Sequence, residues 1–145
     1  MKNTLSIVIP AFDESERLGS TVHQILAYIE KQNLSAELIV VDDGSKDNTA
    51  AVAEKAFAEF PAIEAKVVRY EKNRGKGYAV KIGLQEAKND IALFSDADLS
   101  TPIEETPKLV ELIETGECDV AFGSRALDRS LIGTHQPWRR EQGGK

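Results

Sequence analysis

Two aspartates separated by one residue, Asp96 and Asp98, are the side chains of this sequence best suited to bind a cation. They follow the apolar run 91–94 and precede Leu99 and Ser100. A buried strand that ends in two carboxylates lets both reach one divalent cation, and such a cation suits the diphosphate of a nucleotide. An isolated Asp-x-Asp is more often a solvated acidic loop, because short motifs match by chance. The interpretation therefore depends on the rest of the chain.

A second acidic pair, Asp42 and Asp43, stands directly before Gly44, which permits a tight turn. Ser45 and Asp47 could cap the helix that follows, which gives both a purely structural role. Capping does not account for two adjacent carboxylates, which repel each other and need donors or cations nearby. We expect at least one of this pair to accept hydrogen bonds from a base or a ribose.

The segment Gly75-Lys76-Gly77 precedes a helical pattern and could bring backbone N–H groups close to an anion. It is not the dinucleotide fingerprint, because Val80 stands where the third glycine belongs, and it is not a Walker loop. Lys76 either meets a phosphate or is solvated, and the sequence leaves both open.

Arg125 follows Gly123 and Ser124, two small residues that favour close approach by a ligand. A guanidinium suits two-point contact with a phosphate or a carboxylate. The alternative is a surface arginine paired with Asp119 or Asp128.

Strand-like and helix-like patterns alternate along the chain and would position these residues. Apolar runs predict five strands at residues 5–9, 37–41, 65–70, 91–94 and 120–122, and periodic patterns predict helices at 17–32, 48–60, 77–87 and 107–115. For the last helix, Thr106 is the expected N-cap, and Gly116 stands just past the end. This order predicts an α/β fold with a mainly parallel sheet that has helices on both faces.

Sheets of this kind bind ligands beyond the carboxyl ends of their strands. A polar or glycine-bearing cluster follows each predicted strand, at residues 10–15, 42–45, 73–77, 96–98 and 123–125. The sequence therefore predicts that all five clusters lie along one edge of the sheet.

Composition limits the function further. The chain has 145 residues, a net charge of −6 and one cysteine, Cys118, and these values fit one domain in a reducing, cytoplasmic compartment. The acidic balance argues against broad nucleic-acid binding, which needs a basic surface. No apolar run approaches the length of a membrane span, and Pro10 ends the first one too early for a secretory signal.

Taken together and in order, these clusters resemble glycosyltransferase family 2, whose nucleotide-sugar-binding α/β fold is called GT-A. The resemblance rests on residues 7–14, 40–49, 73–77, 96–98 and 123–125, and so covers nearly the whole chain up to Arg125. Residues 96–102 make the chain most similar to synthases of polyprenyl-phosphate sugars, especially the dolichyl-phosphate glucosyltransferase type. One departure is Phe12-Asp13, where the family commonly has Tyr-Asn, so any hydrogen bond donated by that amide is in doubt.

The resemblance implies roles for the residues of each cluster. The nucleotide sugar would contact a group made of Pro10, Ala11, Phe12, Glu14, Asp42, Asp43, Lys76, Asp96 and Ala97. Mg²⁺ or Mn²⁺ would bind to Asp96 and Asp98, with Ser100 nearby. Asp98 and Arg125 would take part in catalysis, the arginine by contacting a phosphate of the donor or the acceptor.

The implied reaction is inverting transfer of a hexose from a nucleotide sugar, UDP-glucose first and GDP-mannose second, to a polyprenyl or dolichyl phosphate. A phosphate acceptor is already ionised and needs no general base, whereas a sugar hydroxyl needs one, and none stands out here. Transfer to a polysaccharide or cell-wall hydroxyl and nucleotide binding without turnover stay as alternatives. A receiver-like signalling domain is disfavoured because no lysine ends the fifth predicted strand.

The expected domain organisation is a nucleotide-sugar-binding domain at residues 1–125 and the start of an acceptor loop, or a flexible tail, at 126–145. Family catalytic domains are longer, so we expect this chain to be incomplete. The expected location is the cytoplasm, with peripheral contact at the cytoplasmic face of a membrane. The sequence does not predict an oligomeric state.

Overall fold

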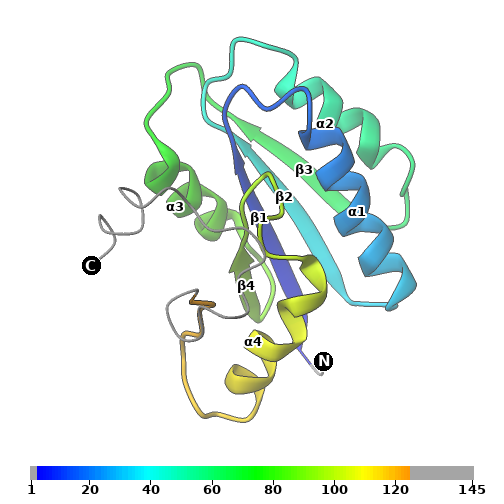
Figure 1. Ribbon diagram of the computed structural model, residues 1–145, viewed down its shortest axis with the longest axis vertical. Helices are drawn as coiled ribbons and strands as arrows, with labels where there is room; N and C mark the ends of the chain where they lie inside the picture. The colour runs from blue at the N-terminus through cyan, green and yellow to red at the C-terminus, as the bar shows by residue number, and fades with distance from the viewer. Residues whose placement is uncertain (1–2, 125–145) are drawn as a thin grey trace.

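Four parallel strands form the sheet of this protein, in the order β3–β2–β1–β4 (Figure 1). The computed structural model describes residues 3–124. The strands are β1 (Leu5–Ala11), β2 (Ala36–Asp42), β3 (Glu64–Arg69) and β4 (Ile91–Phe94). All four point the same way, so the loops that leave their carboxyl ends meet along one edge of the sheet.

A helix follows every strand, as right-handed crossovers between parallel strands require. The helices are α1 (Leu18–Lys31), α2 (Thr49–Phe57), α3 (Lys76–Glu86) and α4 (Thr106–Glu114), with the short 3₁₀ turn η1 (Ile103–Glu105) leading into α4. The predicted α/β class with a mainly parallel sheet is confirmed. Predicted and observed boundaries of these eight elements differ by three residues at most.

Side chains of β1 and β2 alternate between two separate apolar clusters, because successive residues of a strand point to opposite faces. One face packs against α1 and α2 through residues such as Ile7, Leu38 and Ile25. The other face packs against α3 through Val8, Val41 and their neighbours. The two central strands are buried on both faces, which explains why their sequences read as continuous apolar runs.

The predicted fifth strand at residues 120–122 is wrong. These residues form neither helix nor strand, and the side chains of Val120 and Phe122 are 76% and 80% exposed. Strand β4 is an edge strand that pairs with β1 alone among the described residues, and residues 120–122 do not join its open edge. A β-branched pattern alone does not form a strand, because a strand needs a partner for its backbone hydrogen bonds.

The predicted N-cap of the last helix is also wrong. Thr106 is the first residue of α4 itself, its side chain is buried, and the cap position is Glu105. Because η1 precedes α4 without a break, the backbone is already helical at Glu105. The predicted end is confirmed: Gly116 follows α4 with a φ of +76°, the left-handed geometry of many helix ends.

Within residues 3–124, no helix is both long and apolar enough to cross a bilayer. The longest, α1, has 14 residues.

Candidate functional site at the carboxyl edge of the sheet

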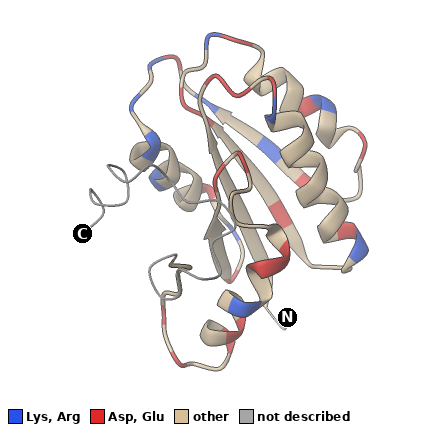
Figure 2. Ribbon diagram, viewed as in Figure 1, with Lys and Arg blue, Asp and Glu red and all other residues tan. Residues whose placement is uncertain are grey.

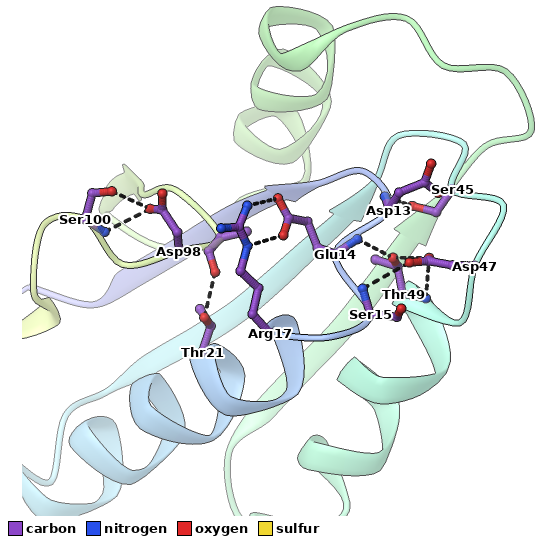
Figure 3. Close-up of polar contacts among 11 residues, drawn as sticks. Asp13, Glu14, Ser15, Arg17, Thr21, Ser45, Asp47, Thr49, Asp98 and Ser100 are labelled. Atoms are coloured by element: carbon purple, nitrogen blue, oxygen red, sulfur yellow. Dashed lines mark hydrogen bonds and ion pairs between the residues drawn. The ribbon is translucent and has the colours of Figure 1, made fainter. Parts of the chain in front are cut away.

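The loops after β1 and β2 are joined by side chain to backbone hydrogen bonds (Figure 3). The hydroxyl of Ser45 accepts from the N–H of Asp13 at 2.9 Å, and the hydroxyl of Thr49 accepts from the N–H of Glu14 at 2.9 Å. The carboxylate of Asp47 accepts from the next N–H along, at 3.1 Å. Three consecutive N–H groups of the first loop are therefore held by three side chains of the second.

Asp47 has a pKa lowered to about 2 from 3.8, chiefly because the Thr49 hydroxyl donates a hydrogen bond to its carboxylate. Its carboxylate also accepts from the N–H groups of Ser15 and Thr49, at 3.1 and 2.9 Å. The ionised form is therefore the one that holds the two loops together. Asp47 also satisfies the first free N–H of α2, which partly confirms its expected capping role.

Acid should weaken the hydrogen bonds by which Asp47 joins the two loops. Because the folded pKa of Asp47 lies below its unfolded value, its contribution to stability is complete above pH 4 or so and is lost as the pH falls toward about 2. As the pH falls through that window, the free energy of unfolding should therefore decrease less for Asp47→Asn than for the wild type. The two decreases should differ by under about 1 kcal/mol, since the carboxylate is solvent-exposed. Urea unfolding at pH 5, 4 and 3 measures this difference. Glu16→Gln, an exposed acid of the same loop, is the control and should retain the wild-type slope.

The side chain of Arg17, which the sequence analysis did not select, lies between Glu14 of the first loop and Asp98 of the loop after β4 (Figure 3). Its guanidinium contacts both oxygens of Glu14, with Nη2 2.7 Å from Oε1. Glu14 raises the pKa of Arg17 most, and the field of Asp98 raises it further. The guanidinium thus lies within the field of two carboxylates from different loops. Acidic positions occur both in the loop after β1 and in the loop after β4 (Figure 2).

The loop from Asp96 to Ser100 is anchored beneath by a buried threonine. Thr21 of α1 donates its hydroxyl proton to the carbonyl of Ala97 at 2.6 Å, and both side chains are buried. Leu99 has a φ of +48°, a conformation that a leucine adopts only when its surroundings impose it. The loop is therefore held in one shape, with Asp96 and Asp98 on either side of the buried alanine.

Asp98 is organised by Ser100, whose N–H and hydroxyl both donate to Oδ1, at 2.9 and 2.7 Å. These two bonds are the main reason that the pKa of Asp98 lies below its usual range, and Arg17 lowers it slightly more. Among the described residues, none donates a hydrogen bond to Oδ2. Asp98 is thus an ionised carboxylate that retains a free oxygen.

Asp96 is paired with a cation from another element. The Nζ of Lys76, the first residue of α3, lies 2.5 Å from its Oδ1. The two side chains are 58% and 47% exposed, so solvent reaches the pair. Sequence reasoning left Lys76 either on a phosphate or solvated. In the structure its side chain is largely exposed and contacts the proposed metal ligand, and its contact with a phosphate stays a prediction.

Asp42 is fully buried at the end of β2. Its Oδ1 accepts the N–H of Ser45 at 2.9 Å, and the Nε of Arg69 lies 3.2 Å from its Oδ2. That approach is close enough for an ion pair but lacks the alignment of a hydrogen bond, so Oδ2 keeps an unused acceptor site. The expected need of this acidic pair for a nearby cation is met by Arg69, at the end of β3.

Asp43 is 3% exposed and fixes the loop that starts α3. Its Oδ1 accepts from the N–H of Arg74 at 2.8 Å, and its Oδ2 accepts from the N–H of Gly75 at 2.8 Å and from the amide of Asn73 at 2.9 Å. A carboxylate with three donors has little capacity left for a ligand. Its observed role is to position the residues that immediately precede Lys76.

The remaining predicted residues fall into two groups. Pro10 and Ala11 are buried at the end of β1, whereas Phe12 is 43% exposed beside them, and their contacts with a nucleotide stay predictions. Arg125 lies outside the described residues, as does the proposed segment 126–145, so its phosphate contact also stays a prediction.

The described residues contain no cluster of three or more histidine, cysteine, aspartate or glutamate side chains able to hold a metal. Two carboxylates and one hydroxyl, from Asp96, Asp98 and Ser100, are nevertheless the hard oxygen donors that Mg²⁺ and Mn²⁺ prefer. Mg²⁺ commonly binds through one or two carboxylates and completes its shell with substrate phosphates and water. The donor set therefore fits a cation that arrives with a diphosphate. A small hollow lined by residues 13–17 and Asp47 does not include Asp96, Asp98 or Ser100.

Sequence reasoning missed Arg17, Thr21 and Asn73 as individual site residues. A signal existed for Thr21, a polar residue within the otherwise apolar inward stripe of α1. Asn73 lies within a segment that had been noted, but its partner is 30 residues away. Nothing in the local sequence distinguishes Arg17 from a surface arginine.

Comparisons with known proteins agree with this geometry. The family model described as glycosyl transferase family 2 matches residues 6–141. The chain is 35% identical to human dolichyl-phosphate beta-glucosyltransferase, over 93% of this chain and 45% of the relative. It is 39% identical to the dolichol-phosphate mannosyltransferase of Pyrococcus furiosus, over 83% of this chain and 33% of the relative.

A solved structure with the same fold is glucosyl-3-phosphoglycerate synthase from Mycobacterium tuberculosis, in complex with Mn²⁺, UDP and glucosyl-3-phosphoglycerate. The TM-score is 0.61 at 30% identity, over 80% of this chain and 41% of the other. The chain thus spans less than half the length of these relatives.

Proposed function

The chain belongs to glycosyltransferase family 2, and on this premise we propose that the edge of its sheet binds a nucleotide sugar together with Mg²⁺ or Mn²⁺. We further propose that the whole protein transfers a hexose to a polyprenyl or dolichyl phosphate. The observation that carries the proposal is the anchored Asp96–Ser100 loop, in which Asp98 keeps an unpaired oxygen beside the exposed carboxylate of Asp96. UDP-glucose is the proposed donor, supported by the glucosyltransferase relatives, and GDP-mannose is second, supported by the mannosyltransferase relative.

In this proposal the residues divide into holding and positioning roles. Asp96, Asp98 and Ser100 would hold the cation, which would supply positive charge to offset that of the leaving diphosphate. Asp42 offers its unused Oδ2 to a base or ribose, although Arg69 must shift before a ligand can reach it. Arg125 stays the proposed contact to a phosphate.

The proposed chemistry is a single displacement at the anomeric carbon. The bond from that carbon to the diphosphate oxygen breaks as a bond to the acceptor oxygen forms on the opposite face, which inverts the configuration. A phosphate monoester acceptor carries an oxyanion near neutral pH, so no general base is required. The dolichyl-phosphate glucosyltransferase and the dolichol-phosphate mannosyltransferase among the relatives support a lipid-phosphate acceptor rather than a sugar hydroxyl. Such an acceptor is a lipid, so we also propose contact with the cytoplasmic face of a membrane.

Thermal unfolding with added nucleotide sugars tests donor binding. UDP-glucose with Mn²⁺, at about one hundred times its dissociation constant, should raise the melting temperature by about 5 °C or more, and UDP-glucose without Mn²⁺ should raise it much less. GDP-mannose should give the smaller shift of the two donors. No shift with either donor in the presence of Mn²⁺ would contradict the proposal.

Asp98→Asn should weaken Mn²⁺ binding at least tenfold and remove most of the Mn²⁺-dependent shift. The substitution keeps the shape of the side chain but removes the negative charge that attracts the cation. Glu30→Gln, which neutralises an exposed acid at the opposite end of α1, should keep the wild-type shift. An unchanged shift in Asp98→Asn would exclude Asp98 as a metal ligand.

A further inference from the structure

Lys76 occupies one of the two carboxylates proposed to bind the cation. Its Nζ lies 2.5 Å from Oδ1 of Asp96, which is direct contact between unlike charges. A divalent cation bound to either oxygen of Asp96 would lie close to this ammonium, so the two positive charges would repel each other. Lys76 therefore opposes binding of the cation to Asp96, and that binding is favoured when the lysine moves away.

The structure makes that departure easy. Both side chains of the pair are about half exposed, and an exposed ion pair is among the weakest interactions that hold a side chain in place. The base of the lysine, by contrast, is fixed: Gly75, directly before it, has a φ of +91° and donates its N–H to the buried Asp43. The ammonium can therefore swing on a fixed anchor and stay close to the site.

The other carboxylate lacks such a direct competitor. Arg17 acts on Asp98 through its field, but its guanidinium is held by Glu14, and the hydrogen bonds to Asp98 come from Ser100. Asp98 is thus available to a cation in the structure as it stands. The two carboxylates differ in this respect, because only Asp96 is already in contact with a cation.

We propose that Lys76 is an internal counter-ion that competes with the divalent cation for Asp96 and, once displaced, contacts the diphosphate of the donor. This inference rests on the proposed function of the site. It assigns Lys76 opposite effects on the two ligands: it weakens binding of the metal alone and strengthens binding of the nucleotide. Before the donor arrives, the lysine would keep the acidic pair neutralised without a metal.

The test measures Mn²⁺ binding without nucleotide, by the electron paramagnetic resonance signal of free Mn²⁺, and then UDP binding by calorimetry at saturating Mn²⁺. Lys76→Met should bind Mn²⁺ about three to ten times more tightly than the wild type, because both the competitor and its repulsion are gone. The same variant should bind UDP at least five times more weakly. Lys76→Arg, which keeps the charge, should lie closer to the wild type in both measurements.

Lys108→Met is the matched control, because Lys108 forms an ion pair of the same length, 2.5 Å, with the similarly exposed Glu105. It should leave both affinities unchanged. Unchanged or weaker Mn²⁺ binding by Lys76→Met would contradict the proposed competition between Lys76 and the cation. Unchanged UDP binding by this variant would contradict the proposed contact of Lys76 with the diphosphate. Failure of the wild type to bind Mn²⁺ and UDP at all would overturn the proposed function and this inference together, whereas wild-type binding with no gain in Lys76→Met would overturn this inference alone.

Discussion

Asp43→Ala should destabilise the protein by about 3 kcal/mol and weaken nucleotide binding in whatever fraction remains folded. The substitution removes a buried carboxylate that accepts three hydrogen bonds, two of them from backbone N–H groups. Hydrogen bonds to charged groups contribute about 1.5–3 kcal/mol each, and donors left without an acceptor add a further cost. Water can reach part of this loop and reduces the total, because Arg74 is exposed.

Urea unfolding measures the loss, with Glu71→Ala as the control. Glu71 is an exposed acid two residues before Asn73, so its removal changes the net charge equally and should cost under about 0.5 kcal/mol. Asn73→Ala should lie between the two, since it removes one side-chain donor and spares both backbone bonds. A loss below about 1 kcal/mol for Asp43→Ala would show that the carboxylate does not hold this loop.

The acidic pair at the end of β2 illustrates what the sequence can and cannot predict. Adjacent carboxylates need compensating donors or cations, and this physical requirement correctly predicted that Asp42 and Asp43 have close partners. It could not identify those partners, because Arg69 and residues 73–75 lie about 30 positions further along the chain. Asp43 accepts a set of internal hydrogen bonds, and its expected contact with a nucleotide stays a prediction.

The strands were predictable for a similar reason. The four real strands each contain apolar residues that bury against helices or neighbouring strands, so local composition and three-dimensional packing agree. Residues 120–122 have a similar composition, but they do not pair with the open edge of β4, and Val120 and Phe122 lie exposed. The hydrophobic pattern of a segment does not indicate whether that segment pairs with a neighbouring strand.

The location of the site could be predicted from the sheet topology more than from the individual motifs. Parallel strands place the loops after β1, β2 and β4 at one edge, so a polar cluster at each strand end predicted their proximity. The details depend on contacts between elements: Thr21 of α1 supports Ala97, and Lys76 of α3 neutralises Asp96. Such pairs are invisible along the sequence, because both partners have alternatives that look equally reasonable locally.

Gly83→Ala should destabilise the protein by about 3 kcal/mol, although helix propensity alone favours alanine within α3 by about 1 kcal/mol. A Cβ at this position would lie 2.2 Å from Cγ1 of Val8 and 3.0 Å from Cγ2 of Val41, on the face of the sheet that α3 covers. Overpacking a close-packed core costs about 1–3 kcal/mol and occasionally more, because the helix must move away from the sheet. Along the sequence, a glycine within a helix indicates only a weak helix former, whereas in the structure its absent side chain is what lets α3 approach the strands.

Two further variants separate packing from propensity. Gly77→Ala changes another glycine of the same helix at a position where nothing lies within 4 Å, so it should be neutral or stabilise the protein by up to about 1 kcal/mol. Val8→Ala in the Gly83→Ala background should recover part of the loss, because it removes the methyl groups that the new Cβ meets. The double variant should therefore be more stable than the sum of the two single losses predicts, when all are measured by urea unfolding. A strictly additive double variant, or a Gly77→Ala as unstable as Gly83→Ala, would mean that contact between α3 and β1 does not determine the need for glycine at position 83.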